Sequence, residues 1–187
     1  MRLILASESP RRRELLQRLG VPFETRSVPT REFADGEVPA PLLPLRNAEA
    51  KARAAAAEYP DALIIGADTV IVFDGRTIGK PRTLREAKRT LLSFSGRTHE
   101  VVTGVALVRA ADDLRIVWSE HTSVTFKKLT EETVDEYLAA VNVLDKAGSY
   151  ALQEHGDMLI SEVRGDLDNV VGLPLGRLAG ELARLDR

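Results

Sequence analysis

The sequence has no cysteine among its 187 residues, and it has no long apolar run. Without thiols the chain cannot form disulfides, thiolate zinc sites, iron–sulfur clusters or a cysteine nucleophile. The N-terminal apolar run covers only Leu3–Ala6, which is shorter than the core of a signal peptide. No segment approaches the roughly 20 apolar residues of a membrane-spanning helix. We therefore expect a cytoplasmic protein that has no membrane partner.

The sequence also lacks an excess of either charge. Its 26 Lys and Arg side chains stand against 28 Asp and Glu, a net charge of −2, which argues against a nucleic-acid partner. The charges are unevenly placed, because residues 1–19 hold five arginines and two glutamates, whereas residues 130–137 hold four acids and no base. This segregation is compatible with one small, highly charged ligand. The length suits a single domain over residues 1–187, at roughly 100–200 residues per domain.

Apolar runs and helix signals predict a mixed α/β fold. Ser9, Thr83 and Thr130 are in positions typical of helix N-caps, and the proline-rich segment 22–44 is expected to be irregular. The helix-rich first part and the strand-rich middle indicate two lobes with a cleft. Helices are expected at residues 11–19, 45–59, 84–94, 131–141 and 174–185. Strands are expected at residues 3–6, 62–66, 70–73, 101–108, 114–126, 150–152 and 158–163.

Three consecutive arginines, Arg11–Arg13, fall in the first turn of the first predicted helix. Cations there oppose the helix dipole, each at a cost of about 0.3–1 kcal/mol. An anion bound at this helix start would remove the conflict, because backbone N–H groups, the Ser7 and Ser9 hydroxyls and the guanidinium groups could all donate to phosphate oxygens. The alternative is a solvated basic face that pairs with carboxylates such as Glu14.

An aspartate, Asp68, follows an apolar strand in the segment Gly66–Thr69, at the kind of strand end where α/β sheets bind ligands. Such a carboxylate can hold Mg²⁺ or orient a water for attack on phosphorus, although a turn aspartate can also bond its own backbone. Lys51 and Lys80 add two cations, each of which could equally be a solvated surface charge. The three histidines have no metal-binding spacing. A cationic helix start, two lysines and a metal-capable aspartate together indicate a phosphate-ester site.

The same segments resemble the Maf family of nucleoside triphosphate pyrophosphatases. Stretches of this sequence match the motifs of that family in order, from residue 5 to residue 175. A single match would say little, whereas seven in register are specific. The matching stretches are Leu5–Arg12, Lys51–Arg53, Gly66–Val70, Gly79–Pro81, Ser95–Val101, Asp145–Tyr150 and Asn169–Leu175.

This resemblance implies a fold and a reaction. The implied fold is an elongated, twisted, mixed sheet flanked by helices, with two lobes and a central cleft, similar to the inosine triphosphate pyrophosphatases. The implied reaction is hydrolysis of a nucleoside triphosphate to the monophosphate and pyrophosphate, assisted by Mg²⁺ or Mn²⁺, as a cleaning of the nucleotide pool. The family also implies a homodimer.

Carried over residue by residue, the resemblance places the triphosphate on Ser7, Arg11 and Arg12. This is the anion site that the dipole conflict suggests independently. Lys51 and Lys80 would neutralise developing negative charge.

The resemblance also supplies the carboxylates and a base-facing side chain. Asp68 would bind the metal, activate water or do both, with Glu32 as a second carboxylate. Gln153 resembles the base-facing glutamine of the branch that prefers dTTP and UTP. Its amide offers both a donor and an acceptor, so it can pair with O4 and N3–H of a pyrimidine.

The sequence departs from the family pattern at three places. Glu154 follows Gln153 where many relatives carry glycine, Arg31 stands where an acidic residue is usual, and Gly165–Asp168 replaces a Gly-Ser-Tyr-Ser run. Two alternatives therefore stay open beside a dTTP/UTP pyrophosphatase. One is the branch that favours 7-methyl-GTP, and the other is a nucleotide-binding regulator of cell division with little catalysis.

Overall fold

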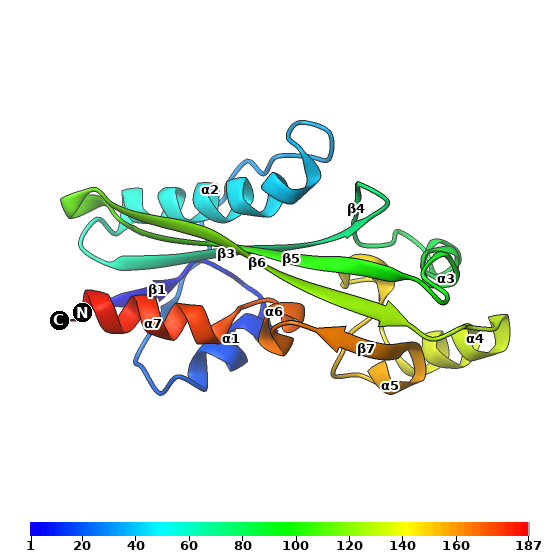
Figure 1. Ribbon diagram of the computed structural model, residues 1–187. Coiled ribbons are helices and arrows are strands. Elements are labelled where there is room, and N and C mark those ends of the chain that lie inside the picture. The colour runs from blue at the N-terminus through cyan, green and yellow to red at the C-terminus, as the bar shows by residue number, and fades with distance from the viewer. Residues whose placement is uncertain (187) are drawn as a thin grey trace.

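The computed structural model describes residues 1–186, which form one mixed sheet with helices on both faces (Figure 1). The strand order is β2-β1-β3-β5-β6-β7, and β4 pairs with β3 beside this path. β1 runs parallel to β2 and β3, whereas the other pairs are antiparallel. The mixed α/β class is therefore confirmed. The strands are β1 Leu3–Leu5, β2 Glu24–Thr25, β3 Leu63–Phe73, β4 Arg76–Ile78, β5 Thr98–Arg109, β6 Leu114–Phe126 and β7 Ile160–Arg164.

The predicted helix starts are confirmed. The side-chain oxygens of Ser9, Thr83 and Thr130 each accept a hydrogen bond from the backbone N–H three residues later. The helices are α1 Pro10–Gln17, α2 Leu43–Glu58, α3 Leu84–Ser93, α4 Glu131–Ala140, α5 Gly156–Leu159, α6 Leu167–Val171 and α7 Leu175–Leu185. Three single 3₁₀ turns accompany them, η1 Ala40–Leu42, η2 Ala110–Asp112 and η3 Ala147–Ser149.

One strand prediction near the C-terminus is wrong, and another is shifted by two residues at its start. Residues 150–152 form no strand, because the backbone N–H of Ala151 donates to the Tyr137 hydroxyl at 3.0 Å and not to a neighbouring strand. The last strand starts only at Ile160, after the short helix α5. Helix α6 was not expected from the sequence, and its first turn is capped by Asp166, which accepts from the Asp168 N–H at 2.8 Å.

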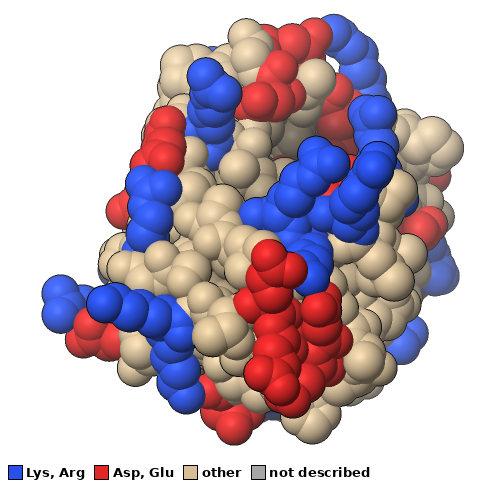
Figure 2. All heavy atoms as spheres, turned by 90° about the vertical axis from the view of Figure 1, so that its right-hand side faces the viewer, with Lys and Arg blue, Asp and Glu red and all other residues tan. Residues whose placement is uncertain are grey.

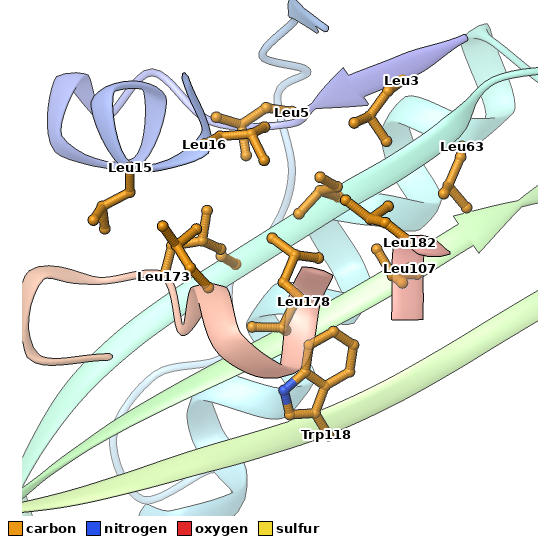
Figure 3. Packing of buried hydrophobic residues seen from close by; sticks show 14 residues of the cluster. Leu3, Leu5, Leu15, Leu16, Leu63, Leu107, Trp118, Leu173, Leu178 and Leu182 are labelled. Carbon is orange, nitrogen blue, oxygen red and sulfur yellow. The ribbon is translucent and has the colours of Figure 1, made fainter. Parts of the chain in front are cut away.

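Apolar side chains pack in separate clusters on the sheet. In Figure 1, α2 covers one face, while α1 and α7 cover the other face toward the end where the termini lie. Beneath α1 and α7, leucines from helices and strands pack together, with Trp118 at the edge of the group (Figure 3). A second cluster joins the far ends of β3 and β6 to α3 and α4. Each fully buried leucine contributes about 1.5–3 kcal/mol, so both ends of the long sheet have a core of their own.

Charged side chains cover the end of the molecule that carries α3 and α4. Figure 2 looks onto this end and shows a blue group above a red one. The two helices are tied by Lys88, whose ammonium lies 3.1 Å from Glu131 and 2.8 Å from Asp135. Among the residues described, no helix combines the length and the apolar character that a membrane crossing requires.

Candidate active site

A cavity of about 550 Å³ lies against the middle of β3, between the two core clusters. It is walled by the start of α1, by α2, by the turn at Lys80, by η3 and by the end of α6. The structure thus places the cleft where the sequence predicted one. All eight residues that sequence analysis selected line it, namely Ser7, Arg11, Arg12, Glu32, Lys51, Asp68, Lys80 and Gln153.

Asp68 lies in the interior of β3 and does not end a strand, so this part of the prediction is wrong. β3 runs without a break from Leu63 to Phe73, and Asp68 is paired in register with Gly104 of β5. Gly66, the last residue of the strand predicted at 62–66, has a packing role. A Cβ at Gly66 would lie 2.1 Å from the Ala48 carbonyl oxygen of α2, so only glycine lets this helix approach the sheet.

Helix α2 brings a lysine onto the Asp68 carboxylate. Lys51 Nζ lies 2.8 Å from Asp68 Oδ1 and 3.2 Å from Glu32 Oε1. The Lys51 and Asp68 side chains are 19% and 14% exposed, whereas Glu32 is 52% exposed. One cation therefore holds two carboxylates, one deep in the cavity and one at its edge.

Asn47 is a site residue that sequence analysis missed. It lies one turn before Lys51 on α2, and its Nδ2 donates to Asp68 Oδ2 at 3.3 Å. The same amide exchanges hydrogen bonds with the backbone of Phe33, accepting at 2.7 Å and donating at 3.3 Å. These bonds fix the loop that carries Glu32. The i, i+4 spacing of Asn47 and Lys51 was the available signal.

The arginine run at the start of α1 divides between cavity and solvent. Arg12 donates from Nε to the Gly172 carbonyl at 2.9 Å, and from its terminal nitrogens to Thr69 Oγ1 at 3.0 Å and Ser7 Oγ at 3.4 Å. The Arg12 pKa is lowered from its ordinary value, mainly by burial of the guanidinium. Arg11 lies 3.5 Å from Asp145, and Arg13 is exposed. Two arginines therefore face the cavity, as an anion site requires.

A third lysine, Lys146, lies in the wall near Gln153, and sequence analysis did not single it out. Only 5% of Lys146 is exposed, and its Nζ lies 3.0 Å from Asp145 and 3.3 Å from Glu154. It also donates to the Asn142 carbonyl. Two hydrogen bonds and an ion pair therefore hold Lys146 in place, and through Glu154 it holds the turn that carries Gln153 and Glu154.

A buried aromatic cluster supports the same wall. His99 is stacked on Phe94 with ring centroids 4.4 Å apart, and its Nε2 lies 2.8 Å from the hydroxyl of Tyr150, which lines the cavity. Desolvation lowers the His99 pKa to about 4 and raises the Tyr137 pKa to about 12. His99 is therefore a neutral core histidine near neutral pH.

The geometry separates two chemical functions within one cavity. Cations and hydroxyls at the start of α1 can bind phosphate oxygens, and the Lys51–Asp68–Glu32 group can orient a water or a metal. Gln153 lines the same cavity on the wall that Lys146 holds in place. This division suits a substrate with a phosphate chain at one end and a hydrogen-bonding ring at the other.

Known proteins resemble this chain over nearly its whole length. A family model described as Maf-like protein matches residues 2–185. A protein of Akkermansia muciniphila named dTTP/UTP pyrophosphatase is 49% identical over 92% of this chain and 90% of its own length. Proteins of the same name from Moorella thermoacetica and Bacillus anthracis are 46% and 44% identical, over 97% and 99% of this chain and 94% and 96% of their own lengths.

A solved structure, that of the Staphylococcus aureus Ham1 protein, superposes with a TM-score of 0.57 over 98% of both chains at 16% identity. That likeness concerns the fold alone. It agrees with the elongated, helix-flanked sheet that the resemblance implies.

Proposed function

This chain belongs to the Maf family, and we propose that it hydrolyses dTTP and UTP to the nucleoside monophosphate and pyrophosphate. The observation that carries the proposal is the convergence of Lys51, Asp68 and Glu32 with the arginines of α1 in one cavity. Relatives at 44–49% identity bear the name dTTP/UTP pyrophosphatase. The cellular role that follows from this reaction is the removal of such nucleotides from the pool.

The arginine side of the cavity binds the triphosphate. Arg11 and Arg12 supply guanidinium groups, and the Ser7 hydroxyl lies beside them. Lys80 lines the cavity from the turn after β4 and adds a further cation. Phosphoryl transfer is catalysed mainly by positioning and by charge neutralisation, and these side chains supply both.

The carboxylate side activates water. A water molecule attacks the α-phosphorus, the bond from that phosphorus to the bridging oxygen breaks, and pyrophosphate leaves with the bond electrons. Asp68 accepts the proton that the water gives up, because Lys51 and Asn47 hold its two oxygens in a fixed orientation facing the cavity. Glu32, whose Oε1 lies 3.2 Å from the Lys51 ammonium, is the second carboxylate.

A divalent metal, Mg²⁺ or Mn²⁺, fits these residues. The described residues contain no group of three or more His, Cys, Asp or Glu able to hold a metal by themselves. Mg²⁺ commonly takes one or two carboxylates and completes its shell with substrate phosphates and waters. Asp68, with Glu32 beside it, would hold such an ion. When bound, the ion neutralises phosphate charge.

The base end of the substrate lies toward Gln153. Its amide can pair with the O4 and N3–H edge of uracil or thymine, and the Lys146–Glu154 pair fixes the turn that carries it. This pairing favours dTTP and UTP over 7-methyl-GTP. A cytoplasmic location and a homodimer remain predictions.

A substrate panel tests the proposal. The protein is incubated with dTTP, UTP and 7-methyl-GTP, each with Mg²⁺ or Mn²⁺, and the products are separated by chromatography. We expect dTMP or UMP with pyrophosphate, and a higher kcat/KM for the pyrimidine nucleotides. Release of orthophosphate and a nucleoside diphosphate would contradict the reaction. Tight nucleotide binding without turnover would favour the division regulator, and a faster reaction with 7-methyl-GTP would favour that branch.

A further inference from the structure

Thr69 connects the substrate cavity to the buried interior of the sheet. It follows Asp68 on β3, and its hydroxyl accepts a hydrogen bond from Arg12 at 3.0 Å. On its other side the same oxygen lies 2.9 Å from the hydroxyl of Thr103 on β5, with which Thr69 is paired in register. Thr103 is fully buried. A polar chain therefore leads from the arginine that faces the substrate into the core.

The direction of the hydrogen bonds in this chain follows from proton counting. Thr103 Oγ1 lies 3.1 Å from the carbonyl oxygen of Asn169, which can only accept. Thr103 has one hydroxyl proton, so that proton is used on Asn169. The bond between the two threonines must then be donated by Thr69. Thr69 accepts from Arg12 because a guanidinium can only donate. Since Thr69 gives its one proton to Thr103, it has none left for a phosphate oxygen.

The far end of this hydrogen-bond chain is buried and is held by further hydrogen bonds. Asn169 is fully buried, and its side-chain amide donates to the Val101 carbonyl at 3.0 Å and to Thr122 Oγ1 at 2.9 Å. Asn169 belongs to α6, which is followed by Gly172, whose carbonyl accepts from Arg12 Nε. α6 thus fixes the arginine both directly and through the two threonines.

Ser7 has the opposite hydrogen-bond state. Its oxygen accepts from the Ser9 backbone N–H at 3.2 Å and from Arg12 at 3.4 Å. Both bonds are accepted, so the Ser7 proton stays available to the substrate. Two hydroxyls therefore flank Arg12, and only one of them can donate to a phosphate oxygen.

We propose that Thr103 is a positioning residue for triphosphate binding, because its buried hydroxyl accepts the Thr69 proton and thereby orients the Thr69 lone pairs toward Arg12. The inference rests on the proposed function, since Arg12 is the residue that binds the phosphate chain. In this arrangement Thr69 and Thr103 support Arg12, whereas Ser7 contacts the substrate directly.

The test compares Thr103→Val with Thr103→Ser. Valine keeps the shape and removes the hydroxyl, whereas serine restores it. We expect Thr103→Val to raise KM for dTTP about tenfold with kcat within about twofold of the parent, because a residue that only supports ground-state binding affects KM. Thr103→Ser should restore KM. The matched control is Thr98→Val, since Thr98 on the same strand bonds Thr125 across the sheet at 2.9 Å and does not line the cavity.

A binding measurement separates this inference from the proposed function. Titration calorimetry with pyrophosphate reports on the phosphate site without turnover, and its Kd should also rise about tenfold in Thr103→Val. An unchanged KM and an unchanged Kd would overturn the role of Thr103 even in an active enzyme. If the parent protein does not hydrolyse dTTP, the proposed function is wrong. If Thr103→Val still lowers the affinity for pyrophosphate in that case, the positioning role of Thr103 stands.

If Thr103→Val does not fold, Thr69→Val tests the same chain from its other end. It removes the acceptor of Arg12, and we expect the same tenfold rise in KM. When both single variants fold, the double variant should be no weaker than either, because members of one hydrogen-bond chain are not additive. Thr69→Val with an unchanged KM, or a double variant with about a hundredfold effect, would contradict the proposal.

Discussion

The Lys51 ammonium lies 2.8 Å from the Asp68 carboxylate, and both side chains are largely withdrawn from solvent. Lys51 comes from α2 and Asp68 from the middle of β3, so the pair exists only because the helix lies close to the sheet. Glycines in β3 and β5 permit that approach. The packing of α2 is thus the structural basis of the candidate catalytic group.

Replacing Asp68 with Asn should abolish most of the activity and leave the fold intact. The amide has the shape of the carboxylate but cannot accept the proton of the attacking water, so kcat should fall at least about 100-fold, the range of general-base effects. Pyrophosphate release measures this effect. The matched control is Asp74→Asn in the β3–β4 turn, where the side chain is 62% exposed and pairs with Arg97. Full activity in Asp68→Asn would remove Asp68 from the mechanism.

Replacing Lys51 with Met should destabilise the protein. Asp68 and Glu32 would both lose their cation, and a largely buried acceptor left without its donor costs at least about 1–3 kcal/mol. Urea unfolding measures the change. The double variant Lys51→Met with Asp68→Asn should be more stable than Lys51→Met alone, because it removes the unpaired charge. If the single and the double variant were equally stable, the unpaired Asp68 charge would not be the cause of the lost stability in Lys51→Met.

His99 should make the stability depend on pH between about 4 and 6.5. Burial lowers its pKa from 6.5 to about 4, so the unfolded chain binds a proton in this range that the folded chain does not. Stability should therefore fall as the pH drops from 6.5 to 4, by up to about 3 kcal/mol. Unfolding free energies measured across this range should flatten in His99→Phe. The control is His121→Gln, because His121 is 44% exposed; an unchanged slope in His99→Phe would contradict the assignment.

The sequence predicts much of this structure for identifiable reasons. Ser9, Thr83 and Thr130 are local signals, and they start their helices as expected. The strand break expected after Gly66 does not exist. A glycine that lets a helix approach the sheet cannot be told, from the sequence alone, from a glycine that ends a strand. The expected strand at 150–152 was wrong because the Tyr137 hydroxyl, 14 residues away, holds that backbone.

The candidate site likewise contains residues that the sequence predicts and residues that it does not. The predicted residues come from segments far apart in the sequence, and the fold brings them into one cavity. Most of them could be predicted because they stand in short local motifs. Thr103 was missed because its contacts with Thr69 and Asn169 join residues far apart in the sequence. Asn47 and Lys146 lie near predicted residues in the sequence, but a single amide or lysine does not indicate which carboxylate it contacts. Their part is to hold other site residues in place.

Gln153→Ala should weaken the choice of base. Without the amide, the cavity loses the donor and acceptor that match a pyrimidine edge, so the preference for dTTP over 7-methyl-GTP in kcat/KM should fall about tenfold or more. Steady-state kinetics with both nucleotides measure the ratio. Gln17→Ala is the matched control, because Gln17 is an exposed glutamine on α1. A ratio unchanged by Gln153→Ala would place the base elsewhere in the cavity.

Hydrolysis of dTTP in ¹⁸O-labelled water tests the central claim most directly. Attack on the α-phosphorus puts the label into dTMP, and the pyrophosphate that leaves carries none. Mass spectrometry of the two products should therefore find one ¹⁸O in dTMP and unlabelled pyrophosphate. Label in pyrophosphate, or in orthophosphate formed beside dTDP, would contradict the account.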